Sequence, residues 1–373
     1  FFLDTIYAAL DAAGAAAPGL HLDVVVPVGI SFYTFQSLSY TIDIYRGKLE
    51  PVDNPLSFLV FVAFFPQLVA GPIVRAAEFL PQLRGTPALS AGQGGRGLFW
   101  IGVGLVKKVL IADLLAVNLV DRVFEMPVQY TSMELLAGVY GYALQIYCDF
   151  SAYSDIAIGS ALLLGFALPQ NFDQPYLAVN LRDFWRRWHI SLSSWLRDYL
   201  YISLGGSRHG PWRTYLNLAV TMLLGGLWHG AGWTFVVWGA LHGGGLAATR
   251  AVQRRRGRRA PRPWTRPLTA VATFHYVCLG SVFFRAPDFA TAWQMLGGLA
   301  RLTRGLANVP LWLVGLMVLG SLTHAVPARA TRQLERAAVW LPAPVQALLL
   351  VGVVVGLQYA RTSDVVPFIY FQF

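Results

Sequence analysis

Charged residues are scarce in this chain. Asp, Glu, Lys and Arg together make up 13% of its 373 residues, whereas soluble domains carry about a quarter. Hydrophobic residues make up 55%, and the mean hydropathy is +0.50. A soluble protein of this composition would aggregate, because it would expose large apolar patches. The composition therefore predicts an integral membrane protein, and the simplest division is one membrane domain over residues 1–373.

Cysteine is also rare. Cys148 and Cys278 are both embedded in apolar sequence, which does not predict a disulfide framework. The sequence lacks the phosphate-binding motif G-x-x-x-x-G-K-S/T, a strand-borne G-x-G-x-x-G, the zinc motif H-E-x-x-H and the nucleophile elbow G-x-S-x-G. These absences argue against an ATPase or a serine hydrolase. No charged segment with a cleavage site precedes the first apolar stretch, so we expect no signal peptide.

Acidic residues are missing from the most basic segment. Eight arginines lie between Arg250 and Arg266, in RAVQRRRGRRAPRPWTR, with no acidic residue among them. The prolines and the glycine predict a loop that does not continue the preceding helix. Short loops rich in Lys and Arg stay in the cytoplasm beside transmembrane helices. We interpret this segment as a topology-setting cytoplasmic loop that also attracts anionic membrane lipid. Nucleic-acid binding is the less favoured alternative, and no nucleic-acid partner is expected.

The apolar segments predict an all-α, polytopic bundle of about eight to ten transmembrane or re-entrant helices. These segments are Val24 to Tyr40, Leu56 to Val74, Gly97 to Val120, Met133 to Leu168 as one long or two broken elements, Tyr215 to Ala248 as a pair, Leu268 to Phe284, Val309 to Val326 and Val339 to Tyr359. Interruptions are predicted at Pro66, at Gly71-Pro72 and at Gly225-Gly226. Backbone groups freed at a break must be satisfied by protein or by a water-lined cavity. We therefore expect an intramembrane tunnel or funnel at the breaks.

The strongest candidate for a functional residue is a histidine in an apolar segment. His229 lies in GGLWHGAGWTFVVWGALHG, where an ionisable side chain is costly and by default functional. Burial favours the neutral imidazole, whose free ring nitrogen can take a proton from a hydroxyl or a thiol. Trp228, Trp233 and Trp238 would wall a site that excludes water, and the nearby glycines would let a thin acyl-carrying arm approach the backbone. The alternative is a packing histidine with a satisfied hydrogen bond.

A second histidine lies in an amphipathic segment, Asn180 to Ser203. At helical spacing this segment carries one apolar stripe, formed by Trp185, Trp188, Leu192, Trp195 and Tyr199. Its arginines and aspartates fit an interfacial or re-entrant helix better than a lipid-facing span, and Asp183 can pair with Arg187 four residues later. We expect His189 to face the same interior as His229, with Trp185 among the substrate-binding residues. The alternative is a hydrogen-bonded interfacial histidine.

Two carboxylates lie in the apolar segment QIYCDFSAYSDIAIG. Asp149 and Asp155 are six residues apart, so they do not share a face of one ideal helix, and the Ser and Tyr residues between them predict a broken, hydrogen-bonded turn. Carboxylates at this depth need partners. Lys107 and Lys108 are the candidates, with Asp113 near them. We favour a satisfied ion-pair network over direct catalysis, and carry both aspartates as candidate substrate-binding residues.

The remaining histidines do not predict a metal site. His242 follows His229 by 13 residues, which is about 20 Å along a continuous helix. The two side chains therefore cannot share a metal ion unless the helix breaks. The other histidines are isolated or loop-like, and ordinary surface or packing roles explain them: His21, His209, His275 and His324.

Five segments closely resemble one protein family. They are PVGISFYTFQSLSYTIDIYRG, FFPQLVAGPI, NFDQPYLAVNLRDFWRRWHISLSSWLRDYLYISLGG, LGGLWHGAGWTFVVWGALHG and the terminal FIYFQF. They resemble the membrane-bound O-acyltransferase family, in its bacterial alginate O-acetyltransferase branch, over nearly the whole chain from Val26 to Phe373. His229 matches the family's essential histidine, and His189 matches its second characteristic histidine.

The resemblance implies a multi-pass enzyme of the bacterial inner membrane. It implies that an acyl group passes from a cytosolic thioester, usually acetyl-CoA, to a hydroxyl of an extracytoplasmic polysaccharide, with extracytoplasmic acetyltransferase proteins as partners and no permanently bound cofactor. Such a transfer needs a base near the attacking oxygen, stabilisation of the oxyanion and exclusion of water. A buried histidine can supply the base. The acceptor stays open among alginate, another exopolysaccharide, cellulose and peptidoglycan.

The beginning of the chain departs from the resemblance. Members of this branch usually carry further hydrophobic helices before a segment like FFLDTI, with which this chain starts. The resemblance therefore implies that the N-terminal helices usual in the family are missing from this chain, and that its C-terminal segment is complete.

A secondary transporter or flippase is the alternative function, because transporters also use broken helices and charges near the membrane midplane. A transporter should show two halves with matching interrupted segments. The polar, histidine-bearing segments cluster between Gln145 and Gly243 without a counterpart elsewhere in the sequence. The sequence therefore favours the acyltransferase.

Overall fold

The computed structural model describes residues 10, 14, 29–68, 71–85, 87–230, 232–257, 264–360 and 368. Within these residues the regular elements are helices and there is no strand, which confirms the all-α prediction. The α-helices are α2 (Ile30–Tyr45), α3 (Pro55–Ala63), α4 (Phe65–Leu68), α5 (Ala76–Phe79), α6 (Ala91–Leu105), α7 (Asp121–Glu125), α8 (Ser132–Leu163), α9 (Leu181–Arg187), α10 (Ile190–Trp195), α11 (Gly210–His229), α12 (Trp233–Arg256), α13 (Thr265–Arg285), α14 (Phe289–Ala300), α15 (Leu311–Ala325), α16 (Ala328–Trp340) and α17 (Ala343–Ala360). Three π-helices, η2 (Val106–Asp113), η3 (Ala116–Val120) and η6 (Leu196–Tyr201), and three short 3₁₀ turns, η1 (Leu80–Arg84), η4 (Pro127–Gln129) and η5 (Pro175–Leu177), complete the order.

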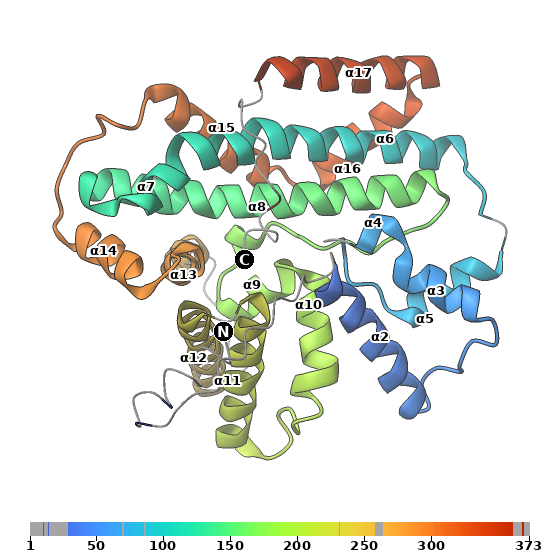
Figure 1. The fold of residues 1–373 in the computed structure, drawn as a ribbon, viewed down its shortest axis with the longest axis horizontal. Helices are drawn as coiled ribbons and strands as arrows, with labels where there is room; N and C mark the ends of the chain where they lie inside the picture. The colour runs from blue at the N-terminus through green and yellow to red at the C-terminus, as the bar shows by residue number, and fades with distance from the viewer. Residues whose placement is uncertain are drawn as a thin grey trace.

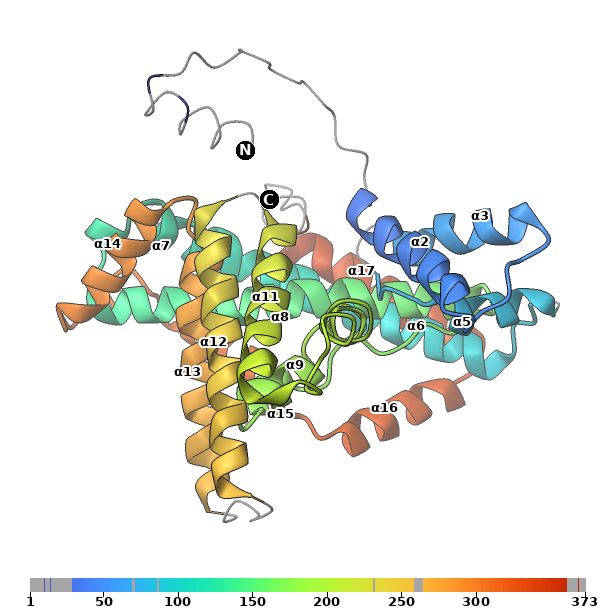
Figure 2. The same ribbon diagram turned by 90° about the horizontal axis from the view of Figure 1, so that it is seen from below.

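Two long helices, α6 and α8, lie side by side through the centre of the molecule (Figure 1). Helices α11, α12 and α13 form a bundle that crosses α8 at a steep angle (Figure 2). The short helices α9 and α10 lie where these two groups meet, and α2 to α5 lie together beyond α10 (Figure 1). The candidate histidines therefore lie at the crossing of the two groups.

Helix α8 is continuous. Its first turn is closed by a capping box, in which the Thr131 side chain accepts from the Glu134 N–H and the Glu134 side chain accepts from the Thr131 N–H. The helix then runs for 32 residues, so the broken turn predicted between Asp149 and Asp155 is wrong. The serines in that stretch bond to other elements instead of interrupting the helix, since Lys107 Nζ donates to Ser151 Oγ at 2.9 Å.

Glycines let α6 and α8 approach closely. A Cβ on Gly97 would lie 2.8 Å from the Gly159 carbonyl oxygen, and a Cβ on Gly159 would lie 2.6 Å from the Gly97 carbonyl oxygen. Only a residue without a side chain fits on either side of such a contact. The approach places η2, which follows α6, directly beside the middle of α8.

The interruption predicted at Pro66 is confirmed. Phe64 adopts an extended backbone after α3, and the short helix α4 follows it. The amide of Gln67 donates to the Phe61 carbonyl oxygen at 2.6 Å, so protein satisfies a backbone group near the break. Gly71-Pro72 lies in the non-helical segment that precedes α5.

The basic segment is more helical than expected. Helix α12 continues through its arginines to Arg256 and ends at Gly257, which has a φ of 62°. The prediction of a loop from Arg250 is therefore wrong, because arginine is a good helix former and the breaking glycine and prolines come only after Arg256. Residues 258–263 lie outside the described residues, and α13 begins at Thr265.

By length and hydropathy, two of the described helices could cross a membrane, α13 and α17. Helices α15 and α16 meet the same criterion together, as a pair bent by 90°. The other described helices do not meet it. The expectation of about eight to ten transmembrane or re-entrant helices, with a tunnel between them, therefore stays a prediction.

Candidate active site

His229 is the last residue of α11, at the point where the chain turns back into α12. Helix α11 runs through Gly225-Gly226 without a break and ends at His229, and α12 begins at Trp233. The break was predicted at the glycine pair, and this is wrong: Gly226 packs against α12 inside a continuous helix. A Cβ on Gly226 would lie 2.4 Å from the Phe235 carbonyl oxygen.

Aromatic rings surround the His229 imidazole. The ring centroids of Trp228, Trp238 and Phe284 lie 4.7, 5.2 and 4.9 Å from the His229 centroid. His229 is half-buried as a whole residue, and its Nδ1 is buried inside this apolar wall. Trp233 was expected in this wall, but the structure places its side chain 56% exposed at the first position of α12.

His189, which lies between α9 and α10, contacts Trp228 as well. Its ring centroid lies 6.4 Å from that of Trp228 and 4.6 Å from that of Phe150 on α8, and its side chain is only 1% exposed. Trp228 is thus in ring contact with both candidate histidines. That the two histidines line one continuous cavity stays a prediction.

The segment that carries His189 is not one helix. It divides into α9, α10 and η6, because His189 has a left-handed backbone with a φ of 42° between α9 and α10. Asn171 satisfies the freed groups: its carbonyl oxygen accepts from Ile190 N at 2.9 Å, and its Oδ1 accepts from Ser191 Oγ at 2.9 Å. The apolar stripe predicted from Trp185 to Tyr199 is therefore split, whereas the predicted ion pair from Arg187 to Asp183 is present at 2.9 Å.

His242 lies much closer to His229 than a continuous helix allows, because the break folds α12 back along α11. Trp238 is in ring contact with both, with centroids 5.2 Å from His229 and 4.6 Å from His242. Trp185 Nε1 lies 3.3 Å from His242 Nδ1 and donates to it. No group of three or more His, Cys, Asp or Glu side chains suited to a metal ion occurs among the residues that the structure describes.

The predicted partners of the two aspartates are confirmed. Lys107 pairs with Asp155, and Lys108 bridges Asp149 at 2.6 Å and Asp113 at 2.8 Å. The pairs join η2 to α8. The arrangement therefore matches a satisfied structural network.

A cavity of about 770 Å³ opens beside this network. Its wall includes Lys107, Asp155, Phe172 and His324, but neither His189 nor His229. Phe172 in this wall lies 5.0 Å, centroid to centroid, from Phe150, which contacts His189. His324 was expected to be an isolated packing residue, but its Nε2 accepts from the Tyr176 N–H at 3.1 Å and it lines the cavity.

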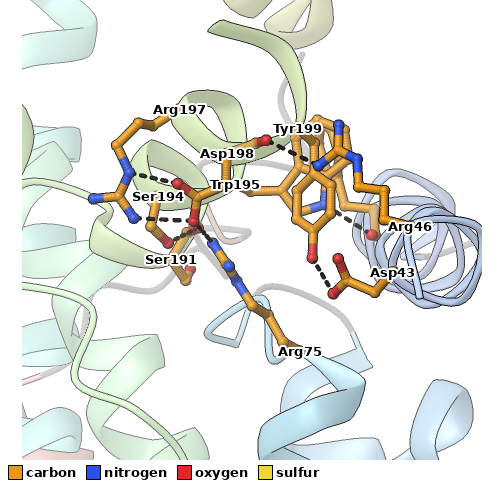
Figure 3. A network of polar contacts seen from close by, with 10 residues as sticks. Asp43, Arg46, Arg75, Ser191, Ser194, Trp195, Arg197, Asp198 and Tyr199 are labelled. Carbon is orange, nitrogen blue, oxygen red and sulfur yellow. Dashed lines mark hydrogen bonds and ion pairs between the residues drawn. The ribbon is translucent and has the colours of Figure 1, made fainter. Parts of the chain in front are cut away.

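A polar network that the sequence did not reveal holds α2 against the site (Figure 3). Asp198 on η6 pairs with Arg75 at 2.5 Å and with Arg197 at 2.6 Å. On the same helix, Tyr199 donates from its hydroxyl to Asp43 Oδ2 of α2 at 2.6 Å. Helix α2 in turn packs its Phe35 ring 5.2 Å from Trp228. No local sequence spacing predicts the contacts of Asp198 with Arg75 and of Tyr199 with Asp43, because these partners lie more than 100 residues apart.

The amino-acid sequence is similar to those of known membrane-bound O-acyltransferases. The model of the membrane-bound O-acyltransferase family matches residues 51–286. A probable alginate O-acetylase of Azotobacter vinelandii is 46% identical over 296 residues, which is 79% of this chain and 58% of that protein. A protein of the same name from Pseudomonas aeruginosa is 47% identical over 272 residues, 73% of this chain and 51% of that protein. A peptidoglycan O-acetyltransferase of Helicobacter pylori is 39% identical over 307 residues, 75% of this chain and 58% of that protein. The chain thus spans a little over half the length of these relatives.

Proposed function

We propose that this chain, which belongs to the membrane-bound O-acyltransferase family, transfers acyl groups to hydroxyls of an extracytoplasmic polysaccharide. The names of its relatives, which refer to alginate and to peptidoglycan, support a polysaccharide acceptor. The observation that carries the proposal is the position of His229 at the break between α11 and α12, walled by Trp228, Trp238 and Phe284.

His229 is the general base of the proposed reaction. A neutral imidazole takes the proton of the acceptor hydroxyl while the hydroxyl oxygen attacks the thioester carbonyl carbon. The carbon–sulfur bond then breaks, and the imidazolium returns the proton to the leaving thiolate. The aromatic wall keeps water away, which protects the thioester from hydrolysis and strengthens the electrostatic interactions inside the site.

His189 is the second proposed catalytic residue, because its ring reaches Trp228 from a separate element. Trp228 and Trp185 are the proposed substrate-binding aromatics, and Trp233 is less suited to that role because it is exposed. Asp149 and Asp155 support the site through the η2–α8 ion pairs, and direct substrate binding by them is the less favoured role.

The proposed donor, partners and cellular location rest on the resemblance to the family. Acetyl-CoA is the proposed donor, no cofactor is permanently bound, and extracytoplasmic acetyltransferase proteins are the proposed partners. The protein belongs in the bacterial inner membrane as one multi-pass domain surrounded by lipid. Transfer of radiolabelled acetyl groups from acetyl-CoA by purified protein would distinguish this function from that of a secondary transporter or flippase, which consumes no thioester.

Replacing the proposed base tests the function directly. We expect His229→Ala to lower acetyl transfer by about 10² to 10⁴ fold, which is the usual contribution of a general base. His189→Ala should cause partial or complete loss. The full-length protein would be co-expressed with its polysaccharide machinery, and acetyl ester content of the polymer would be measured together with the yield of monodisperse protein in gel filtration.

His275→Ala is the matched control, because His275 hydrogen-bonds Tyr140 at 2.7 Å on an exposed face and touches no member of the proposed site. It should retain normal acetylation. Wild-type acetylation by well-folded His229→Ala protein would remove His229 from the mechanism.

A further inference from the structure

The charge of one long segment is entirely of one sign. Residues 199–287 contain eleven arginines and no aspartate, glutamate or lysine. The topology-setting role of Lys and Arg in cytoplasmic loops accounts for the sign of this charge. It requires only that the arginines lie on one side of the membrane, and it does not explain where they lie relative to one another.

Two of these arginines line one pocket, which lies between the start of α11 and the end of α12. Arg250 and Arg254, four residues apart on α12, line a pocket of about 490 Å³ together with Gln253. Ser207 and Tyr215 bring hydroxyl groups to the opposite wall, which is formed by the start of α11 and the segment before it. Among the residues that the structure describes, no carboxylate lines this pocket.

A third element adds positive charge beside the pocket. Arg182 on α9 donates from its guanidinium to Gln253 Oε1 at 3.4 Å. Burial and the neighbouring charges of Arg186 and Arg250 lower the pKa of the Arg182 side chain from its ordinary value. Within the described part of the chain, Arg182, Arg250 and Arg254 form no ion pair with a carboxylate. Like charges held together without a counter-ion repel one another, so an anion at this position would relieve the repulsion.

We propose that this pocket, lined by Arg250, Arg254, Gln253, Ser207 and Tyr215, is a phosphate-binding site. Guanidinium groups bind phosphate oxygens through paired, charge-assisted hydrogen bonds, and the hydroxyl and amide groups supply further donors. The phosphate belongs either to the headgroup of an anionic lipid or to a soluble phosphate-bearing molecule of the cytosol. The site is distinct from the histidine cluster, since Gly210 and His229 are separated by the length of α11, about 29 Å.

The test uses purified full-length protein in neutral detergent at fixed ionic strength, with calorimetric titration of three probes. Inorganic pyrophosphate represents a soluble phosphate, dioctanoyl phosphatidylglycerol represents a lipid headgroup, and dioctanoylglycerol is the same lipid without its phosphate. We expect saturable binding of pyrophosphate or of phosphatidylglycerol, but not of dioctanoylglycerol. The phosphate probe that binds identifies the source of the phosphate.

The variant Arg250→Gln/Arg254→Gln should weaken that binding by about tenfold or more, because it removes two charge-assisted hydrogen-bond donors. The control Arg255→Gln/Arg256→Gln removes the same charge from the same helix, at positions that do not line the pocket. It should weaken binding by less than about threefold, through loss of long-range attraction only. Equal weakening by the two variants, binding of dioctanoylglycerol, or no saturable binding of either phosphate probe by the wild type would overturn the proposal.

Discussion

His189 is one of three non-glycine residues with a left-handed backbone in the described part of the chain. This conformation costs an ordinary L-residue about 1–2 kcal/mol, because its Cβ crowds the following carbonyl oxygen. The hydrogen bonds from Ile190 and Ser191 to Asn171 hold the turn in place. A glycine would fit the backbone better, so the presence of an imidazole there favours a role for the ring itself.

The strain at His189 predicts an unusual order of stability. We expect His189→Gly to be more stable than His189→Ala by about 1 kcal/mol, the reverse of the order in a helix interior, while both variants lose part or all of their acetyl transfer. Unfolding followed by intrinsic fluorescence and acetyl transfer would be measured on the same preparations. An alanine variant as stable as the glycine variant would show that the backbone is not strained there.

At the same scale, the sequence predicted pairs that depend on local spacing and missed pairs that depend on the tertiary fold. Arg187 and Asp183 are one helical turn apart, so their ion pair could be foreseen. The lysine partners of Asp149 and Asp155 were also foreseen, because few cations are available near them in the apolar sequence. The approach of His242 to His229 was missed, since it depends on where α11 ends.

Among the elements, the pair of α11 and α12 determines the site, because it places His229 at a reversal of the chain. Gly226 and Gly239 occupy the contact between the two helices: a Cβ on Gly226 would meet the Phe235 carbonyl oxygen, and one on Gly239 would lie 2.6 Å from the Met222 carbonyl oxygen. The sequence predicted a break at Gly225-Gly226, but in the structure Gly226 serves close packing. Glycine can break a helix or allow two helices to pack closely, and the hydrophobic periodicity of the sequence alone cannot distinguish these two roles.

Adding one methyl group at this contact tests its importance. We expect Gly226→Ala to destabilise the protein by about 1–3 kcal/mol, as overpacking does, and to lower acetyl transfer because His229 lies three residues further on. Thermal unfolding in detergent and transfer activity would be compared with the wild type.

Gly244→Ala is the matched control on α12, because nothing lies within 4 Å of the added Cβ. It should leave stability unchanged or slightly raised, since alanine favours helix over glycine. A Gly226→Ala protein as stable and active as Gly244→Ala would mean that the two helices can separate freely at this point.

At the scale of the whole molecule, the basic ends of α12 and α13 project together beyond the neighbouring helices (Figure 2). The arginines along the end of α12 and the start of α13 predict that this end lies in the cytoplasm. The fold class was predictable from composition, because an apolar chain in a membrane must satisfy its backbone within helices. The arrangement of the helices was not, because it depends on contacts between residues that are distant in sequence.

Cysteine accessibility tests this orientation. We expect Gly257→Cys, at the end of α12, to be labelled by a membrane-impermeant maleimide only after cells are permeabilised. Gly257 has no neighbour within 4 Å of an added Cβ, and the native Cys148 and Cys278 are buried, so background labelling should be low. Labelling of the variant in intact cells would place this end outside.

The π-helical segment η2 holds one residue more than a regular α-helix would in the same place. Its adjacent residues Lys107 and Lys108 both reach carboxylates of α8, although neighbours on a regular α-helix point about 100° apart. Deleting a single residue from Val106–Asp113 would therefore restore a regular helix and keep the elements that follow in register, but the two lysines could no longer both face α8. Descendants of this gene with such a one-codon deletion should keep the fold and lose one of the two lysine ion pairs.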